Sequence, residues 1–219
     1  IKLATDPVLI TVSQRSRLNI GYKSKNLDTY FSIQDVRFWG DDDNYSATAT
    51  QGNTKGVSIH QAWFMLKPSE KISIKTGRQQ FSYDDQRVLS ARNWNDYQVT
   101  YDALFFQYKT KNDKVDVAVS WNASGSSDAL YPKGKFKTVD FVRYEHPFGK
   151  VNFSAIALLT GNTLADTVSD IALLGTYGVG LLYDQKGYNF RFNGYYQTDM
   201  NENSGDISAW CLSVFGQKK

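Results

Sequence analysis

Runs of about ten residues in which apolar and polar side chains alternate recur eleven times along this chain, separated by turns rich in Gly, Asn, Asp and Lys. In the run from Tyr188 to Gln197, one face carries Tyr188, Phe190, Phe192, Gly194 and Tyr196, and the other carries Asn189, Arg191, Asn193, Tyr195 and Gln197. Successive side chains of a strand point to opposite faces, so each run reads as a strand with one apolar and one polar face. Strands of soluble proteins usually have about five or six residues, whereas tilted strands of about nine to eleven residues cross a bilayer. The pattern predicts an all-β chain, an antiparallel up-and-down meander of about eleven long strands that is part of a transmembrane β-barrel.

The expected strands alternate between short and long connections. The strands are Val12–Lys23, Asp28–Gly40, Val57–Leu66, Lys71–Tyr83, Tyr97–Lys109, Lys114–Ala123, Lys135–Glu145, Lys150–Thr160, Leu173–Asp184, Tyr188–Gln197 and Ile207–Phe215. The long connections are Asp41–Gly56, Asp84–Asp96, Ser124–Gly134, Gly161–Ala172 and Thr198–Asp206. Outer-membrane barrels have short periplasmic turns and longer outer loops, so this alternation favours the barrel and orients the chain. A soluble β-sandwich, with the apolar faces covering a shared core, is the alternative fold.

Strand parity assigns each side chain to lipid or to the lumen. The residues expected to face lipid are Leu18, Ile20 and Tyr22 in the first strand, Leu104, Phe106 and Tyr108 in the fifth, and Val115, Val117, Val119 and Trp121 in the sixth. Those expected to face the lumen are Arg15, Arg17, Asn19 and Lys23, then Ala103 and Gln107, and then Asp116, Ala118, Ser120 and Asn122. In the second strand Phe31 and Ile33 share a face with Asp35 and Arg37, and a β-bulge near Ser32–Gln34 would reconcile them.

Composition narrows the class of protein further. The chain has 219 residues and a mean hydropathy of −0.46, and no apolar stretch approaches the roughly 18 residues that a membrane helix needs. A net charge of +3 without a dense Lys/Arg run gives no indication of nucleic-acid binding. The single Cys211 excludes an internal disulfide and a cysteine-based zinc site, and no cofactor is indicated. An odd number of strands leaves an unpaired edge in lipid, so residues 1–219 are expected to form a single but incomplete barrel domain.

One segment carries a resemblance to a known family. It is Gly77-Arg78-Gln79-Gln80-Phe81-Ser82-Tyr83-Asp84-Asp85-Gln86-Arg87-Val88-Leu89, followed by Asn93-Trp94-Asn95 and Tyr101-Asp102-Ala103-Leu104. With Ser13-Gln14-Arg15-Ser16-Arg17-Leu18, Ile33-Gln34-Asp35-Val36-Arg37 and Ile59-His60-Gln61-Ala62-Trp63, it resembles the alginate-export family of outer-membrane porins, most closely over Val12 to Tyr108. The resemblance implies a bacterial outer-membrane barrel of about 18 strands whose arginine-lined lumen passes an anionic polysaccharide. It also implies the lipid bilayer and lipopolysaccharide as surroundings.

Arginines on the polar faces fit such a lumen. The residues expected along the substrate path are Arg15, Arg17, Arg37, Arg78 and Arg191. Inward guanidinium groups attract carboxylates and bind them in a bidentate manner. Asp84, Asp85, Asp35 and Asp102 are expected to hold some of these arginines. Each arginine could equally serve only to pair with a neighbouring aspartate inside the lumen.

The connection from Tyr83 to Trp94 is expected to form a constriction loop. Its members are Asp84, Asp85, Arg87, Arg92 and Trp94, and ion pairs would keep it folded. Asp84, Asp85 and Asn93 offer the hard oxygen atoms that calcium prefers, although their spacing matches no EF-hand, and no metal site is assigned.

Three functions remain open from the sequence. The first is a passive outer-membrane conduit for an anionic oligosaccharide or polyuronate. The second is a non-conducting structural or receptor barrel whose long loops bind a surface ligand, and a lumen crossed by a folded loop would favour it. The third is an outer-membrane hydrolase, for which only His60 and His146 are available, and His60 could lie on the lipid face beside Ser58. The absence of a recognisable catalytic arrangement argues that the chain is not an enzyme.

Overall fold

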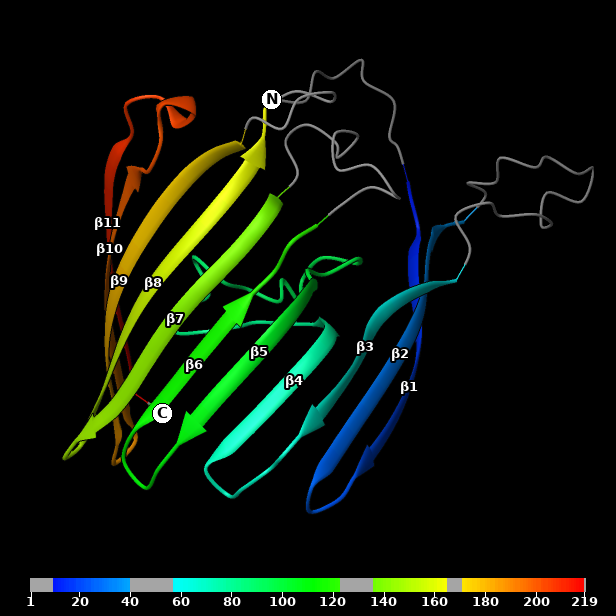
Figure 1. The fold of residues 1–219 in the computed structure, drawn as a ribbon, viewed down its shortest axis with the longest axis horizontal. Helices are drawn as coiled ribbons and strands as arrows, with labels where there is room; N and C mark the ends of the chain where they lie inside the picture. Colours follow the sequence, from blue (N-terminus) through cyan, green and yellow to red (C-terminus); the bar gives the residue numbers. More distant parts are fainter. Residues whose placement is uncertain (1–9, 40–56, 123–135, 165–170, 219) are drawn as a thin grey trace, which may run out of the picture.

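Eleven antiparallel strands form one sheet in which every strand pairs with its neighbours in the sequence (Figure 1). The computed structural model describes residues 10–39, 57–122, 136–164 and 171–218. The strands are β1 (Ser13–Lys23), β2 (Leu27–Phe38), β3 (Ser58–Leu66), β4 (Ile72–Gln79), β5 (Tyr101–Lys109), β6 (Lys114–Val119), β7 (Phe136–Phe148), β8 (Val151–Thr163), β9 (Ile171–Gln185), β10 (Tyr188–Asp199) and β11 (Ser208–Lys218). One short 3₁₀ turn, η2 (Glu202–Ser204), precedes β11. Across the described ranges, no helix is long and apolar enough to cross a membrane.

The fold class and the order of the strands agree with the expectation from the sequence. The largest difference lies between β4 and β5. The two strands end and begin at Gln79 and Tyr101, so their connection covers residues 80–100 and is longer than the predicted Asp84–Asp96. The predicted long connections Asp41–Gly56 and Ser124–Gly134, and residues 165–170 of Gly161–Ala172, lie outside the described residues.

The sheet curves around residues 80–100, which lie within the curve (Figure 1). We call the side of the sheet that contacts this segment the inner face, and the opposite side the outer face. The ends of the strands next to the short turns are the short-turn end, and the opposite ends are the long-loop end.

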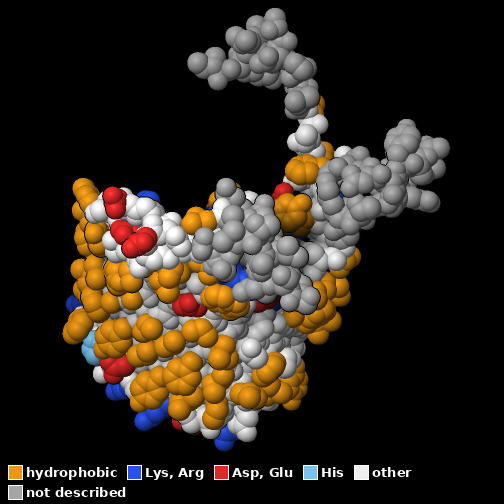
Figure 2. All heavy atoms as spheres, turned by 45° about the horizontal axis from the view of Figure 1, so that its top comes forward, with side chains coloured by type: hydrophobic (Ala, Val, Ile, Leu, Met, Phe, Trp, Pro, Cys, Tyr) orange, Lys and Arg blue, Asp and Glu red, His pale blue; other side chains and the backbone are white. Residues whose placement is uncertain are grey.

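Apolar side chains remain exposed on the outer face (Figure 2). They include Leu18, Ile20 and Tyr22 of β1, Leu104 and Phe106 of β5, Val119 of β6, and Tyr188, Phe190 and Phe192 of β10. The side-chain orientations predicted for the first, fifth, sixth and tenth strands are therefore confirmed. A sandwich would bury these residues against a second sheet, whereas the structure leaves them open on a single sheet, as expected of a surface that faces lipid.

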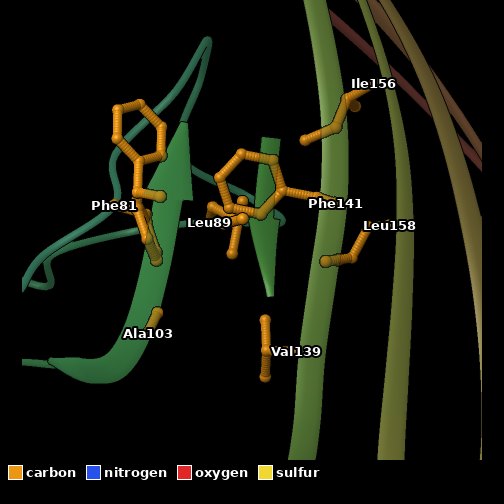
Figure 3. Packing of buried hydrophobic residues seen from close by; sticks show 9 residues of the cluster. Phe81, Leu89, Ala103, Val139, Phe141, Ile156 and Leu158 are labelled. Atoms are coloured by element: carbon orange, nitrogen blue, oxygen red, sulfur yellow. The ribbon is translucent and has the colours of Figure 1, made fainter. Parts of the chain in front are cut away.

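A small apolar core lies on the inner face. Phe81 and Leu89 of the 80–100 segment contact Phe105, Phe141 and Val139 of the sheet, and all five are buried (Figure 3). Phe81 meets Phe141 edge-on, with 5.0 Å between ring centroids. This core explains why Phe105, which shares the inner face of β5 with Ala103 and Gln107, is apolar: it packs beneath the segment.

A register shift lies where the bulge was predicted, between Ser32 and Ile33, but the extra residue is not in β2. The pairing of β1 with β2 runs without interruption from Ser13 opposite Phe38 to Lys23 opposite Asp28. The irregularity lies in the partner strand, where Ser32 pairs with Gln61 and Ile33 pairs with Ile59. The extra residue is thus His60 of β3, and the faces of β2 keep their simple alternation.

Candidate functional site

Residues 80–100 form a folded segment across the inner face, and we call it the inward segment. Four of its residues have positive φ: Asp84 (51°), Gln86 (62°), Arg92 (48°) and Gln98 (60°). Such angles are uncommon outside glycine, and they turn the chain sharply enough to keep a long connection inside the sheet. Phe81 and Leu89 hold the first half of the segment in the apolar core. Polar contacts hold the turn at Asp84 and Asp85, between these two residues, and the far end at residues 95–98.

Asp84 forms several polar contacts with the sheet. Its Oδ1 accepts hydrogen bonds from Arg143 Nη2 at 2.9 Å and from Ser154 Oγ at 2.8 Å. Arg143 also donates to Glu145 through Nη1, at 2.7 Å. Arg191 Nη1 donates to the backbone carbonyl of Asp84 at 2.9 Å. Strands β7, β8 and β10 therefore all hold this one turn of the segment.

Two tyrosines extend this anchor. Tyr195 of β10 donates to Asp85 Oδ1 at 2.7 Å. Tyr83 donates to Asp116 Oδ2 at 3.0 Å, and Lys114 pairs with the same carboxylate at 3.1 Å. Burial, together with the neighbouring Asp116 carboxylate, raises the pKa of the Tyr83 hydroxyl, so this group stays protonated and remains a donor.

The other end of the inward segment contacts β1 and β2. Arg15 Nη1 donates to the backbone carbonyls of Asn95 at 3.2 Å and Asp96 at 3.4 Å. Arg17 donates to two amide oxygens, Gln98 Oε1 at 3.2 Å and Gln34 Oε1 at 2.6 Å. All of these acceptors are neutral. Among the described residues, neither arginine forms an ion pair, so their positive charges are not neutralised by direct contact.

Arg37 and Arg78 do not lie on the inner face, and their predicted lumen positions are wrong. Arg37 pairs in register with Gln14, on the opposite face from Arg15, and forms an ion pair with Asp35 at 2.6 Å. Arg78 lies opposite Asp102 and binds it through two hydrogen bonds of 2.9 and 2.7 Å. Both arginines share the outer face with the exposed apolar residues of their own or neighbouring strands. The expectation that Asp35 and Asp102 hold arginines is confirmed, but on the outer face.

The remaining predicted members of the constriction loop are near its surface. Arg87 forms an ion pair with Asp85 at 3.2 Å. Arg92 and Trp94 are exposed, Trp94 to 81%, and the backbone carbonyl of Arg92 accepts a hydrogen bond from the amide of Asn95 at 2.9 Å. The predicted folded loop is therefore present, with the Arg87–Asp85 ion pair within it and several hydrogen bonds to the sheet.

Arg143 was missed from the sequence, although it is the most buried arginine of the site, with 6% of its side chain exposed. Its neighbours Phe141 and Val142 lie on opposite faces of β7, and both are apolar. Phe141, on the inner face, packs under the inward segment. The alternation of apolar and polar residues in β7 therefore does not predict that Arg143 faces inward.

Asp84 and Asp85 are not arranged for calcium. Their oxygen atoms accept hydrogen bonds from Arg143, Ser154 and Tyr195, and in the described part of the chain no group of His, Cys, Asp or Glu side chains is placed to hold a metal ion.

The placement of His60 on the lipid face is wrong. The bulge in β3 turns His60 to the inner face, where its side chain is 2% exposed. His146 lies at the short-turn end and contacts Asp113 Oδ1 at 2.8 Å. Neither histidine has the serine neighbour that the hydrolase hypothesis required among the hydrogen bonds of the described residues.

A family model described as alginate export matches residues 12–213. The chain belongs to the alginate export family. The match extends well beyond the Val12 to Tyr108 region on which the resemblance rested and covers ten complete strands and most of β11. A comparison with individual curated proteins found no match. Membership of a transport family, together with the meander of long strands, makes this an outer-membrane β-barrel protein of alginate export.

Proposed function

We propose that this chain forms part of a conduit that passes an anionic polysaccharide of the alginate type through a lumen lined by Arg15, Arg17 and Arg191. The observation that carries the proposal is the pairing of Arg15 and Arg17 with neutral acceptors only. A guanidinium group that donates to a carbonyl keeps its full charge and still attracts carboxylates. Arg191 likewise donates to a backbone carbonyl.

The surroundings of the barrel are part of the same proposal. The exposed apolar outer face would contact the bilayer, with lipopolysaccharide around the long-loop end. Strands β1 and β11 are the edges of the described sheet. Unpaired backbone groups cost several kcal/mol each in lipid. We therefore propose that further strands complete one barrel domain. The family resemblance implies a total of about eighteen strands.

The test is ion selectivity of the full-length protein in planar bilayers. Replacing Arg15 and Arg17 together by Ala should shift the reversal potential toward lower anion preference, and replacing both by Glu should shift it toward cations. Added salt should weaken the wild-type preference, because screening shortens the reach of the charges to about 3 Å at 1 M. The matched control is Arg37→Ala with Arg78→Ala, which removes two arginines from the outer face and should leave selectivity unchanged. A wild-type pore that prefers cations would rule the proposal out.

The inward segment also favours a second candidate, a receptor or structural barrel whose lumen is closed. The segment touches β7 to β10 at one end and β1 and β2 at the other. A barrel of this kind would show no single-channel conductance, whereas the conduit would conduct.

A further inference from the structure

Positive charge is distributed unevenly over the two sides of the inner face. On β6 and β7, cationic side chains meet carboxylates: Arg143 meets Asp84 and Glu145, and Lys114 meets Asp116. On this side, Arg191 of β10 donates to the backbone carbonyl of Asp84. On β1 to β4, the ion pair of Lys67 with Asp28 lies at the short-turn end. Arg15, Arg17 and Lys75 form no ion pair with any described residue. We call the inner surface of β1 to β4 the charged wall.

Lys75 lies much closer to the short-turn end of this wall than Arg15 and Arg17 do. It pairs in register with Met65, which pairs with Asp28, which in turn pairs with Lys23. Lys75 is therefore level with Lys23, eight residues from Arg15 along β1. At roughly 3.4 Å per residue, the three cations span about 27 Å of the strands.

An aromatic pair lies between these cations. Tyr30 and Trp63 are stacked, with ring centroids 5.6 Å apart and an interplanar angle of 26°. They occupy one cross-strand row with a glycine on each side, Gly21 beside Tyr30 and Gly77 beside Trp63. Neither glycine has a side chain that would cover the rings. Gly77 has a φ of 115°, and a Cβ there would lie 2.2 Å from the carbonyl oxygen of Ala62, so this row is built around glycine.

The aromatic pair is held in place by its neighbours. Trp63 Nε1 donates to Gln61 Oε1 at 3.2 Å, and Lys75 Nζ lies 4.2 Å from the centroid of the Trp63 ring. Hydrogen bonds between glutamine side chains continue from Gln61 into the inward segment. Gln61 donates to Gln80 at 3.1 Å, and Gln80 donates to Gln98 at 3.0 Å. Gln98 also accepts from Arg17, so one connected network joins the aromatic pair to the arginines.

The chemistry of this wall fits an acidic polysaccharide. Cations without carboxylate partners bind carboxylates, amide groups both donate to and accept from hydroxyl groups, and aromatic rings supply rigid apolar contact area. The side chains of Tyr30, Trp63, Lys75 and Gln61 are each partly exposed, so they are available at the surface of the lumen.

We propose that the charged wall is the track along which the acidic polysaccharide binds, with Trp63 and Lys75 forming a subsite for one uronate unit. Lys75 binds the carboxylate and the Tyr30–Trp63 pair contacts the sugar ring. The opposite wall, where Arg143 and Lys114 pair with carboxylates and Arg191 donates to a backbone carbonyl, supports the inward segment. This inference rests on the proposed function.

The experiment measures how long alginate oligosaccharides block the ion current of the full-length pore. Trp63→Leu and Lys75→Met should each shorten the block at least fivefold, while Trp63→Tyr and Lys75→Arg should keep it near wild type. The matched control is Phe215→Leu, an exposed aromatic residue on the inner face of β11, and it should have no effect. A neutral gluco-oligosaccharide of equal length should block briefly and lose little in Lys75→Met.

The outcomes separate this inference from the function on which it rests. If Trp63→Leu and Lys75→Met leave the block unchanged while the Arg15 and Arg17 double variant loses anion selectivity, the conduit stands and the track is wrong. Equal effects of Phe215→Leu and Trp63→Leu would also overturn the track. If the Trp63→Leu protein fails to fold, the block times of Trp63→Tyr and Lys75→Met are compared instead. Equal block times in these two variants would contradict the subsite.

Discussion

Arginine side chains divide here according to what accepts their hydrogen bonds. Arg143, Arg37, Arg78 and Arg87 each contact at least one carboxylate. Arg15, Arg17 and Arg191 contact carbonyl or amide oxygens. The first group contributes to structure with little effect on the field in the lumen, whereas the second adds net positive charge. Counting arginines in the sequence therefore overstates the charge available to an anion, and only their acceptors separate the two groups.

Arg143 should be the arginine on which stability depends most. Replacing it by Gln leaves Asp84 and Glu145 without their cation, and breaking a buried pair of this kind costs about 3–5 kcal/mol. We expect the lower end of that range, because the Glu145 side chain is 35% exposed. The free energy of unfolding by urea in lipid vesicles measures the effect. Arg37→Gln, which removes an exposed ion pair, should cost at most about 1 kcal/mol. Equal losses in the two variants would contradict the anchoring role of Arg143.

At the scale of elements, the strands were predictable from the sequence. Side chains alternate with a period of two residues, and each strand needs apolar residues toward lipid and polar residues toward water, so the pattern is visible within a single strand. β10 shows it from Tyr188 to Gln197 and β1 from Arg17 to Lys23, since no purely apolar side chain lies on the inner face there. β5 and β7 do not, because Phe105 and Phe141 on the inner face pack against the inward segment. Apolar residues on both faces of these strands thus result from packing against the inward segment. The sequence of a single strand does not show which distant segment covers it.

The errors in the candidate site have the same origin. In β2 the pattern itself placed Arg37 with Phe31 and Ile33, and the outward position was correct. The bulge that would have turned it inward exists, but on β3 at His60, where pairing rather than sequence reveals it. Arg78 follows Ile72 and Ile74 on the outward side of β4. Charged residues near strand ends can face outward, because the cost of a charge on the lipid face falls to about 0–1 kcal/mol near the interfaces.

The turn between β5 and β6 should be sensitive to acid. Asp113 accepts hydrogen bonds from Tyr144 at 2.7 Å and contacts His146 at 2.8 Å, and these bonds, with that of Tyr144 first, lower the pKa of its carboxyl group. A lowered pKa in the folded state means that the stabilisation is present above the unfolded value of about 3.9 and is lost as the pH falls through the folded value.

Hydrogen exchange of the turn amides at a series of pH values tests this. In the wild type, protection should fall below about pH 4. Asp113→Asn should have low protection that no longer changes over this range. Tyr144→Phe removes the main donor and should move the loss of protection to higher pH. If the transition in Tyr144→Phe coincides with that of the wild type, the tyrosine does not set the state of this carboxyl group.

For the whole molecule, the inward segment divides the space within the sheet. Its apolar residues Phe81 and Leu89 pack on β5, β7 and β8, the turn at Asp84 reaches β10, and Asn95 reaches β1. The strand ladders do not depend on it, because consecutive strands pair with one another along the whole sheet. The segment is thus a separately held element, and loosening it should leave the barrel intact while widening the path through it.

Replacing Phe81 and Leu89 together by Ala tests this directly. Each is at most 4% exposed, and truncation of buried Phe or Leu to Ala costs about 2–5 kcal/mol. That loss falls mainly on the docking of the segment. In planar bilayers we expect larger and noisier single-channel conductance, with the anion preference retained because Arg15 and Arg17 stay on β1. The control is Val119→Ala, which truncates an exposed residue of the outer face and should change neither property. Unchanged conductance in a variant whose segment has become open to protease would mean that ions pass elsewhere, and that the segment does not form the constriction.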